Sequence, residues 1–279
     1  MRAVLLLQCP DRPGIVAAVG AFVADTGGNV VEADQHSDPA AGLFLQRIEF
    51  DVDSTAGALH DGFAPIATHF AMDWSLHDLA ARPRVAVLAS RQGHCLGDLL
   101  VRNALGEFNG DFVLVASNHD THASLVERFG VPFRHLPVRD DARDEQERAL
   151  GALLAEIAPD VVVLARYMRV IPGWITESWT ERMINIHHSF LPSFAGARPY
   201  AQAHERGVKL IGATAHYVTG DLDEGPIIEQ DVERVDHSRH VEDLVALGQD
   251  VERRALARAV RWHAEHRVLL DGHRTIVFR

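Results

Sequence analysis

The chain has 279 residues, of which 47% are hydrophobic, enough for two ordinary domains that each bury a core. Its formal charge of −12 disfavours a nucleic-acid partner, because the basic residues are interleaved with acids and form no evident basic face. The two cysteines, Cys9 and Cys95, suit neither a disulfide framework nor a metal site, and no apolar run reaches membrane-spanning length. We therefore expect a cytoplasmic protein with no membrane partner.

Residues 1–80 predict a small α+β domain in the order β-α-β-β-α-β. A strand is expected over 3–8, and residues 15–26 carry apolar side chains at helical spacing. Gly27 and Gly28 end that helix, as glycines near a C-terminal cap do. Alternating strands over 30–36 and 43–52, a helix over 55–70 and a strand over 72–76 complete a ferredoxin-like fold.

A plausible linker over 77–84 precedes a second domain, which we expect over residues 84–279. Here short runs rich in Val, Ile and Leu alternate with helices such as 141–158; the runs cover 85–89, 112–116, 133–136, 161–165 and 183–187. This alternation predicts a Rossmann-like α/β domain with a mostly parallel, doubly wound sheet. A helix over 241–267 and a strand over 275–278 are expected to finish the chain.

The polar residues best suited to chemistry lie near the end of the strand expected over 182–187. Asn185 and His187 are two positions apart, so their side chains point to one face, whereas His188 should point to the other. Asp223 lies at a loop edge before a Gly-Pro turn. An amide, an imidazole and a carboxylate together suit a one-carbon acyl group, because one polarises its oxygen and the others move protons. Considered alone, however, Asp223 would also fit a turn cap.

Longer motifs surround these residues and carry a resemblance. Asn185-Ile186-His187 with Leu222-Asp223 resembles the signature of the 10-formyltetrahydrofolate-dependent formyltransferase fold. The segments HHSFLP (187–192), GARPY (196–200) and IGATAHY (211–217) are similar to those of the formyltetrahydrofolate deformylase family. In the first domain, CPDRPG (9–14) and GNV (28–30) resemble an ACT domain. The likeness covers nearly the whole chain.

The resemblance implies hydrolysis of 10-formyltetrahydrofolate to tetrahydrofolate and formate, with water as the formyl acceptor, in one-carbon and purine metabolism. It implies that Asn185, His187 and Asp223 are catalytic and that neither a metal nor another cofactor is needed. No His-Glu-x-x-His zinc motif is present in the sequence. Folate contacts are expected from Arg166, Tyr167, Met168, Arg169, Val170, Thr214, His216, Gly220 and Leu222. His216 has the alternative role of holding Asp223.

The likeness to ACT domains implies an amino-acid effector in the first domain. Its candidate ligand residues are Asp11, Gly14 and Asn29, which would equally serve to shape turns. Because ACT domains commonly pair, we also expect a homo-oligomer, either a dimer or a tetramer.

Three other classes of function stay open: a formyltransferase that acts on an acceptor such as a nucleotide sugar, glycinamide ribonucleotide or transfer RNA, a regulatory sensor, and an oxidoreductase. Formyltransferases for glycinamide ribonucleotide hold the acceptor's phosphate in a Gly- and Ser-rich loop after the first strand of this domain. Here the loop reads Ser90-Arg91-Gln92-Gly93-His94, a poor backbone nest for phosphate, so water is the expected acceptor. A transfer-RNA formyltransferase is disfavoured by the acidic charge. A regulatory sensor with a relic catalytic fold would bind folate without turnover. A dinucleotide-dependent oxidoreductase is disfavoured because no Gly-x-Gly-x-x-Gly follows strand 85–89.

Overall fold

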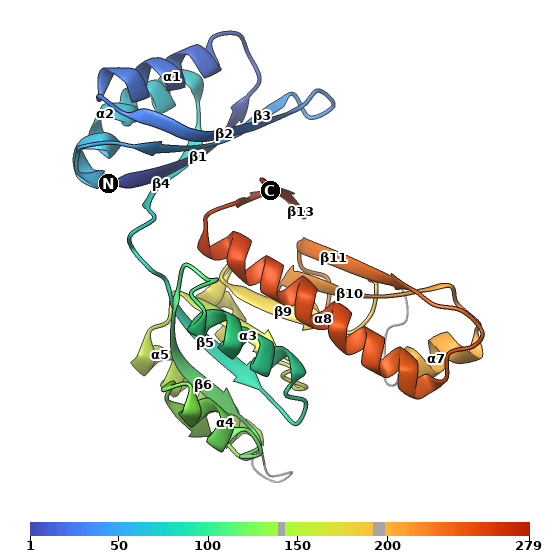
Figure 1. Ribbon diagram of the computed structural model, residues 1–279. Helices are drawn as coiled ribbons and strands as arrows, with labels where there is room; N and C mark the ends of the chain where they lie inside the picture. Colours follow the sequence, from blue (N-terminus) through green and yellow to red (C-terminus); the bar gives the residue numbers. More distant parts are fainter. Residues whose placement is uncertain (139–142, 192–198) are drawn as a thin grey trace. The chain divides into compact units, whose positions relative to one another are not determined.

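The computed structural model describes residues 1–138, 143–191 and 199–279 (Figure 1). Pro192 and the first part of the GARPY motif, at 196–198, lie outside the described residues. The chain forms two compact units: Met1–Arg82 with Glu265–Leu269 and Ile276–Arg279, and Pro83–Ala264 with Leu270–Thr275. Each unit is described by itself below.

The first unit is built on an antiparallel four-stranded sheet in the order β2-β3-β1-β4. Its elements follow the predicted β-α-β-β-α-β order: β1 (Arg2–Pro10), α1 (Ile15–Asp25), β2 (Asn29–Asp38), β3 (Leu43–Asp51), α2 (Ala56–Phe70) and β4 (Asp73–Asp78). The helices pack on one face of the sheet, where Leu5, Leu7, Phe22 and Phe63 form the core. The sequence therefore predicted the type and order of these six elements correctly.

The other face of that sheet is covered by the end of the chain, which the sequence did not predict. Val4, Leu6 and Leu45 are buried there against Phe278, with Leu269 packed beside them. Along β1, Leu5 and Leu7 face the helices and alternate with Val4 and Leu6 on the other face. Because β1 is apolar on both faces, the face without helices also has to be covered. The segments 265–269 and 276–279, expected in the second domain, supply it.

The second unit contains a seven-stranded sheet in the order β11-β10-β9-β8-β5-β6-β7. The pairs from β9 through β7 are parallel, as predicted, whereas β10 is antiparallel to both of its neighbours. Its elements are β5 (Arg84–Ala89), α3 (His94–Ala104), β6 (Asp111–Ser117), α4 (Ala123–Arg128), β7 (Phe133–His135), α5 (Arg143–Ile157), β8 (Val161–Ala165), α6 (Gly173–Thr176), η1 (Glu177–Trp179), β9 (Met183–His187), α7 (Pro199–Glu205), β10 (Leu210–Tyr217), β11 (Ile227–Arg234) and α8 (Val241–Ala264). The last two strands, β12 (Val268–Asp271) and β13 (Arg274–Val277), pair with each other in a separate two-stranded sheet, and each has residues in both units.

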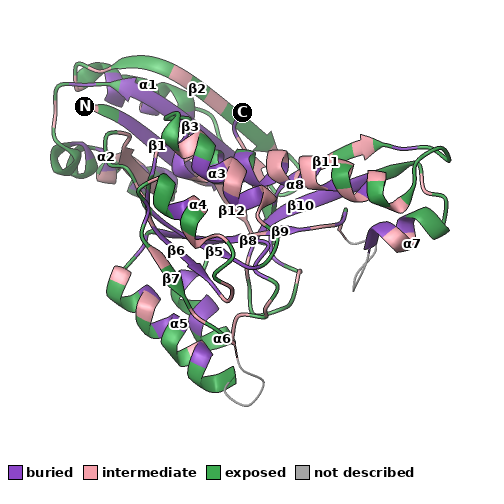
Figure 2. Cartoon of the chain, turned by 60° about the horizontal axis from the view of Figure 1, so that its bottom comes forward, coloured by how far each residue is buried: buried purple, intermediate pink, exposed green. Residues whose placement is uncertain are grey.

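Helices cover both faces of this sheet, so its central strands are buried (Figure 2). On one side, Leu150 and Leu154 of α5 and Ile175 of α6 share a core cluster with strand residues such as Leu88 and Leu164. On the opposite side α8 lies along β9, β10 and β11 and contacts α3. The carboxyl ends of β5, β8 and β9 consequently lie side by side at one edge, which is where sheets of this type bind ligands.

Candidate active site

A cavity of about 310 Å³ lies beyond the carboxyl ends of β8 and β9. Its walls come from the segment after β8, the end of β9, and the loop between β10 and β11. All the predicted catalytic and folate-contacting residues line it, with Thr214 as the one exception. The rest of the lining consists of Leu164, Ile171, Ile186, His188, Val218, Thr219 and Asp221. Tertiary structure thus brings together residues that are far apart in the sequence, such as Arg166 and Asp223, which are 57 positions apart.

Thr214 is placed differently from the prediction. Its side chain is fully buried, and its hydroxyl donates to the carbonyl of Ser189 at 3.0 Å and accepts from the backbone N–H of Leu191 at 3.1 Å. The amide of Gln230 donates to the same oxygen at 3.1 Å. With its hydroxyl engaged in this way, Thr214 holds the segment that follows β9, and it does not line the cavity.

His187 and Asp223 both line the cavity and contact each other there. Nδ1 of His187 lies 3.2 Å from Oδ2 of Asp223, and the hydrogen bond between them lowers the pKa of Asp223. Asp223 has a φ of +59°, a left-handed conformation that Asp and Asn tolerate better than most residues. The following Gly225 packs directly on the carbonyl of Tyr217, leaving no space for a Cβ atom. This close approach holds the loop that carries Asp223.

The remaining ring nitrogen of His187 has no partner among the residues that the structure describes. This Nε2 atom is buried, and the His187 side chain is 9% exposed. A buried polar atom without a partner is costly unless a ligand or water completes it. His187 therefore has one nitrogen committed to Asp223 and one available to a bound molecule.

Asn185 is oriented by His216. Nδ1 of His216 lies 2.8 Å from the carbonyl of Tyr217, and a carbonyl only accepts, so Nδ1 carries the hydrogen. Burial lowers the pKa of His216, so the ring is neutral and Nε2 has a lone pair. Nδ2 of Asn185, at 3.2 Å, donates to it, which leaves its second N–H for the cavity. His216 also lies near Asp223, with 3.7 Å between Nε2 and Oδ1.

The expectation that His187 and His188 point to opposite faces was wrong. Their rings stack, with centroids 5.1 Å apart and planes inclined by 14°. Strand alternation fails here because β9 ends at His187, so His188 is no longer in a pleated strand. Burial, with the charge of Arg166 as the second cause, lowers the pKa of His188 to about 4.

The low pKa of His188 predicts a pH-dependent stability. An unfolded histidine takes up a proton near pH 6.5, whereas folded His188 stays neutral down to about pH 4. The unfolded state then binds more protons, so the free energy of unfolding falls as pH drops from 6.5 to 4, by about 1–3 kcal/mol from this group. We expect urea titrations across that range to show a shallower pH slope for His188→Gln. The exposed His60→Gln is the control, and an unchanged slope in His188→Gln would contradict the assignment.

The predicted effector residues lie at the surface of the first unit. Asp11 and Gly14 are in the turn between β1 and α1, and Asn29 is the first residue of β2. Gly14 has a φ of +98° and caps the start of α1, a conformation that favours glycine. Gly14 thus has a clear structural role, and effector binding by the three residues stays a prediction.

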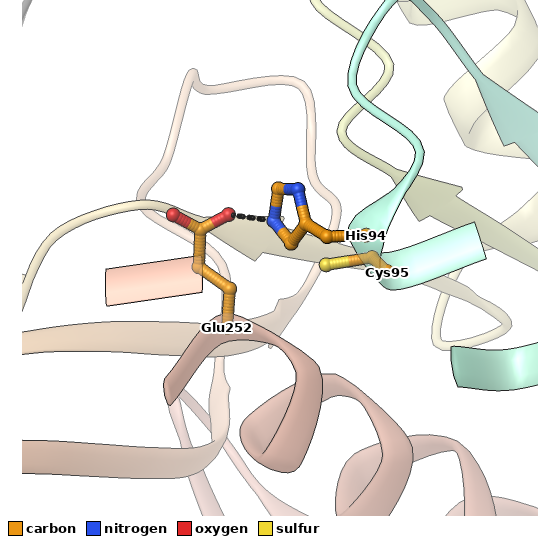
Figure 3. A group of neighbouring side chains, drawn as sticks. All are labelled: His94, Cys95 and Glu252. Carbon is orange, nitrogen blue, oxygen red and sulfur yellow. Dashed lines mark hydrogen bonds and ion pairs between the residues drawn. The ribbon is translucent and has the colours of Figure 1, made fainter. Parts of the chain in front are cut away.

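Sequence reasoning missed a group of polar side chains close to the cavity. Glu252 of α8 is 1% exposed and bonds to His94, the first residue of α3, with Cys95 next to it (Figure 3). Glu252 shares a helix stripe with the buried Leu256 and Ala259, four and seven positions on. A carboxylate on an otherwise apolar stripe is the signal that would have identified it.

Comparison with known families agrees with this geometry. The model described as Formyl transferase matches residues 83–260, and the model described as ACT domain matches residues 3–60. Fold and site together define an enzyme of the formyltransferase fold that carries an ACT domain.

Individual relatives narrow this class. The formyltetrahydrofolate deformylase of Bacillus subtilis is 48% identical over 278 residues, covering 98% of this chain and 93% of its own length. A crystal structure of a formyltetrahydrofolate deformylase from Pseudomonas syringae pv. tomato matches with a TM-score of 0.96 at 46% identity, over 100% of this chain and 95% of that one. A glycinamide ribonucleotide transformylase from Symbiobacterium toebii gives 0.66 at 34% identity, over 71% and 95%. The chain belongs to the formyltetrahydrofolate deformylase family.

Proposed function

We propose that this chain hydrolyses 10-formyltetrahydrofolate to tetrahydrofolate and formate, with water as the formyl acceptor. The observation that carries the proposal is the convergence of Asn185, His187 and Asp223 on one cavity, each with a polar atom directed to the space between them. The family membership supports the same reaction.

In the proposed mechanism, the oxygen of a water molecule attacks the formyl carbon and Asp223 accepts a proton from that water. The free N–H of Asn185 donates to the formyl oxygen as negative charge builds; one such donor is commonly worth about 10²–10³ in rate. When doubly protonated, His187 keeps Nδ1 on Asp223 and donates from Nε2 to the same oxygen or to the leaving nitrogen. General acid–base help of this kind contributes about 10²–10⁴. The leaving nitrogen has no hydrogen in the substrate, so it takes a proton from Nε2 of His187 as the carbon–nitrogen bond breaks and formate leaves. The proton that Asp223 accepted from water then passes on to restore His187.

The folate would lie against the apolar side chains at the mouth of the cavity. Met168 is 57% exposed, Val170 55% and Leu222 68%, an unusual concentration of exposed apolar groups around one opening. A bound pterin ring would cover them, while Arg169 at the same rim suits an anionic part of the substrate.

A timed assay tests the proposal. Purified protein is mixed with 10-formyltetrahydrofolate without an added acceptor, and tetrahydrofolate and formate are followed together. We expect equal release of both, unaffected by a chelator, because the mechanism needs no metal or cofactor. Tight folate binding without release would instead favour a sensor, and formyl transfer only after an amine is added would favour a formyltransferase.

The remaining proposals concern regulation, oligomeric state and location in the cell. ACT domains typically bind amino-acid effectors, and we propose that a small amino acid binds near Asp11, Gly14 and Asn29 and changes the hydrolysis rate. We also propose a homo-oligomer, a dimer or a tetramer, that works in the cytoplasm. Among the described residues, no helix combines the length and apolar character needed to cross a bilayer. An amino-acid titration that alters neither activity nor melting temperature would count against the effector.

A further inference from the structure

We propose that a buried charge cluster next to the cavity makes water the formyl acceptor, because it fills the space through which an acceptor amine would approach. The charge cluster consists of Arg166, Glu252, His94 and Tyr200, with Gln92 at its outer edge. The inference rests on the proposed hydrolysis and adds the residues that exclude other acceptors.

The charge cluster occupies a position where this type of sheet normally binds a ligand. Arg166 directly follows β8, and His94 begins α3 just after β5, so both stand at the carboxyl ends of neighbouring strands. Glu252 contacts both Arg166 and His94 from α8. Arg166 is 7% exposed and Glu252 is 1% exposed. Side chains of the protein therefore fill the space that a second substrate would need.

Short contacts hold the charge cluster together. Oε2 of Glu252 lies 2.7 Å from Nε2 of His94, and Oε1 accepts from the hydroxyl of Tyr200 at 2.7 Å. Nε of Arg166 lies 3.3 Å from Oε2 of Glu252 and donates to Oε1 of Gln92 at 2.8 Å. Burial alone would raise the pKa of Glu252, but the bond from His94 and the charge of Arg166 outweigh it, so this carboxyl has a lowered pKa and is ionised.

Arg166 connects the charge cluster to the reacting groups. It lines the same cavity as His187 and His188, and its charge contributes to the lowered pKa of His188. With Arg166 held on Glu252, side-chain atoms occupy this side of the reacting groups, which excludes an amine with its substituents, whereas a water molecule is small enough to enter. Arg166 also has a φ of +61°, a left-handed conformation that favours glycine, so the cluster holds this arginine in a strained backbone conformation.

A metal site is the other interpretation of this region. His94, Cys95 and Glu252 each offer a ligand atom, and these atoms lie within 4.8 Å of one another (Figure 3). The guanidinium of Arg166 already neutralises Glu252 and would repel a second cation. Burial also raises the pKa of the Cys95 thiol, whereas a metal ligand has to be a thiolate. The contacts therefore favour the ion-paired cluster.

The test measures where the formyl group goes when glycinamide is added as a probe amine. In transfer, a new carbon–nitrogen bond to the amine forms as the bond to the folate nitrogen breaks, and the proton released by the amine goes to that nitrogen. The paired variant Arg166→Gly/Glu252→Gln removes both charges together and relaxes the backbone at 166. We expect the ratio of formylglycinamide to formate to rise about tenfold or more over wild type. Arg254→Ala, which removes an arginine of α8 that is paired with Asp231 instead of Glu252, should leave the ratio unchanged.

Folding of the paired variant is checked by circular dichroism and folate binding. A folded, folate-binding variant that still gives formate and tetrahydrofolate one to one would overturn the inference, as would one zinc per chain that is lost in Glu252→Gln. If the paired variant does not fold, Gln92→Gly frees one side of Arg166 without unpairing a buried charge. It should raise the ratio more than Arg91→Gly in the same loop, and equal ratios in the two would overturn the inference. Absence of hydrolysis by the wild type would refute the proposed function instead.

Discussion

Asp223→Asn is expected to lower kcat about 10²–10⁴-fold, the usual contribution of a general acid–base group, while folate binding changes little. Asparagine has the same shape and tolerates the φ of +59° at this position, so the substitution removes the charge without disturbing the loop. Steady-state kinetics combined with equilibrium binding of a non-reactive folate analogue would separate the two effects.

Asp221→Asn is the matched control and should keep a kcat close to that of the wild type. Asp221 lies two positions earlier on the same loop and lines the same cavity, but His187 contacts Asp223. Because the pKa of Asp223 is lowered, activity limited by its carboxylate should be lost only on the acid side of the ordinary aspartate range. Near-normal turnover in Asp223→Asn would refute the role proposed for this residue.

Asn185→Ala is expected to lower kcat about 10²–10³-fold, the usual effect of removing one donor to a developing oxyanion. The donor is strongest in the transition state, so KM should change much less than kcat. Asn185→Asp keeps the shape but has no N–H, and it adds a carboxylate beside His216. It should be at least as impaired as the alanine variant.

A control variant and a threshold in kcat test the role proposed for Asn185. Asn103→Ala removes an amide from α3, away from the cavity lining, and should keep wild-type kinetics. If Asn185→Ala retains more than about one fifth of wild-type kcat, the amide is not an oxyanion donor. A rise in KM with kcat unchanged would give Asn185 a role in ground-state binding only.

Local pattern predicted most of the fold, because periodicity and turn residues act over a few positions. The alternation along 30–36 and 43–52 and the helical spacing over 15–26 gave β2, β3 and α1 nearly at their observed bounds. The antiparallel strands β10 and β11 were not predicted from periodicity. β10 is buried along seven of its eight residues and so does not alternate, a pattern that periodicity alone cannot assign.

The sequence by itself determined the two-domain α/β architecture and the family resemblance, and it carries the prediction that Asn185, His187 and Asp223 are catalytic, because each of these rests on short-range motifs. Tertiary structure alone decided which polar atoms meet. It placed Asp223 on Nδ1 of His187, set Asn185 against a neutral His216, and buried the hydroxyl of Thr214 away from the cavity. It also paired Arg166 with Glu252, 86 positions apart, and brought Phe278 onto β1. Such contacts depend on how separate elements pack, and no periodicity within one element encodes the position of a side chain on another.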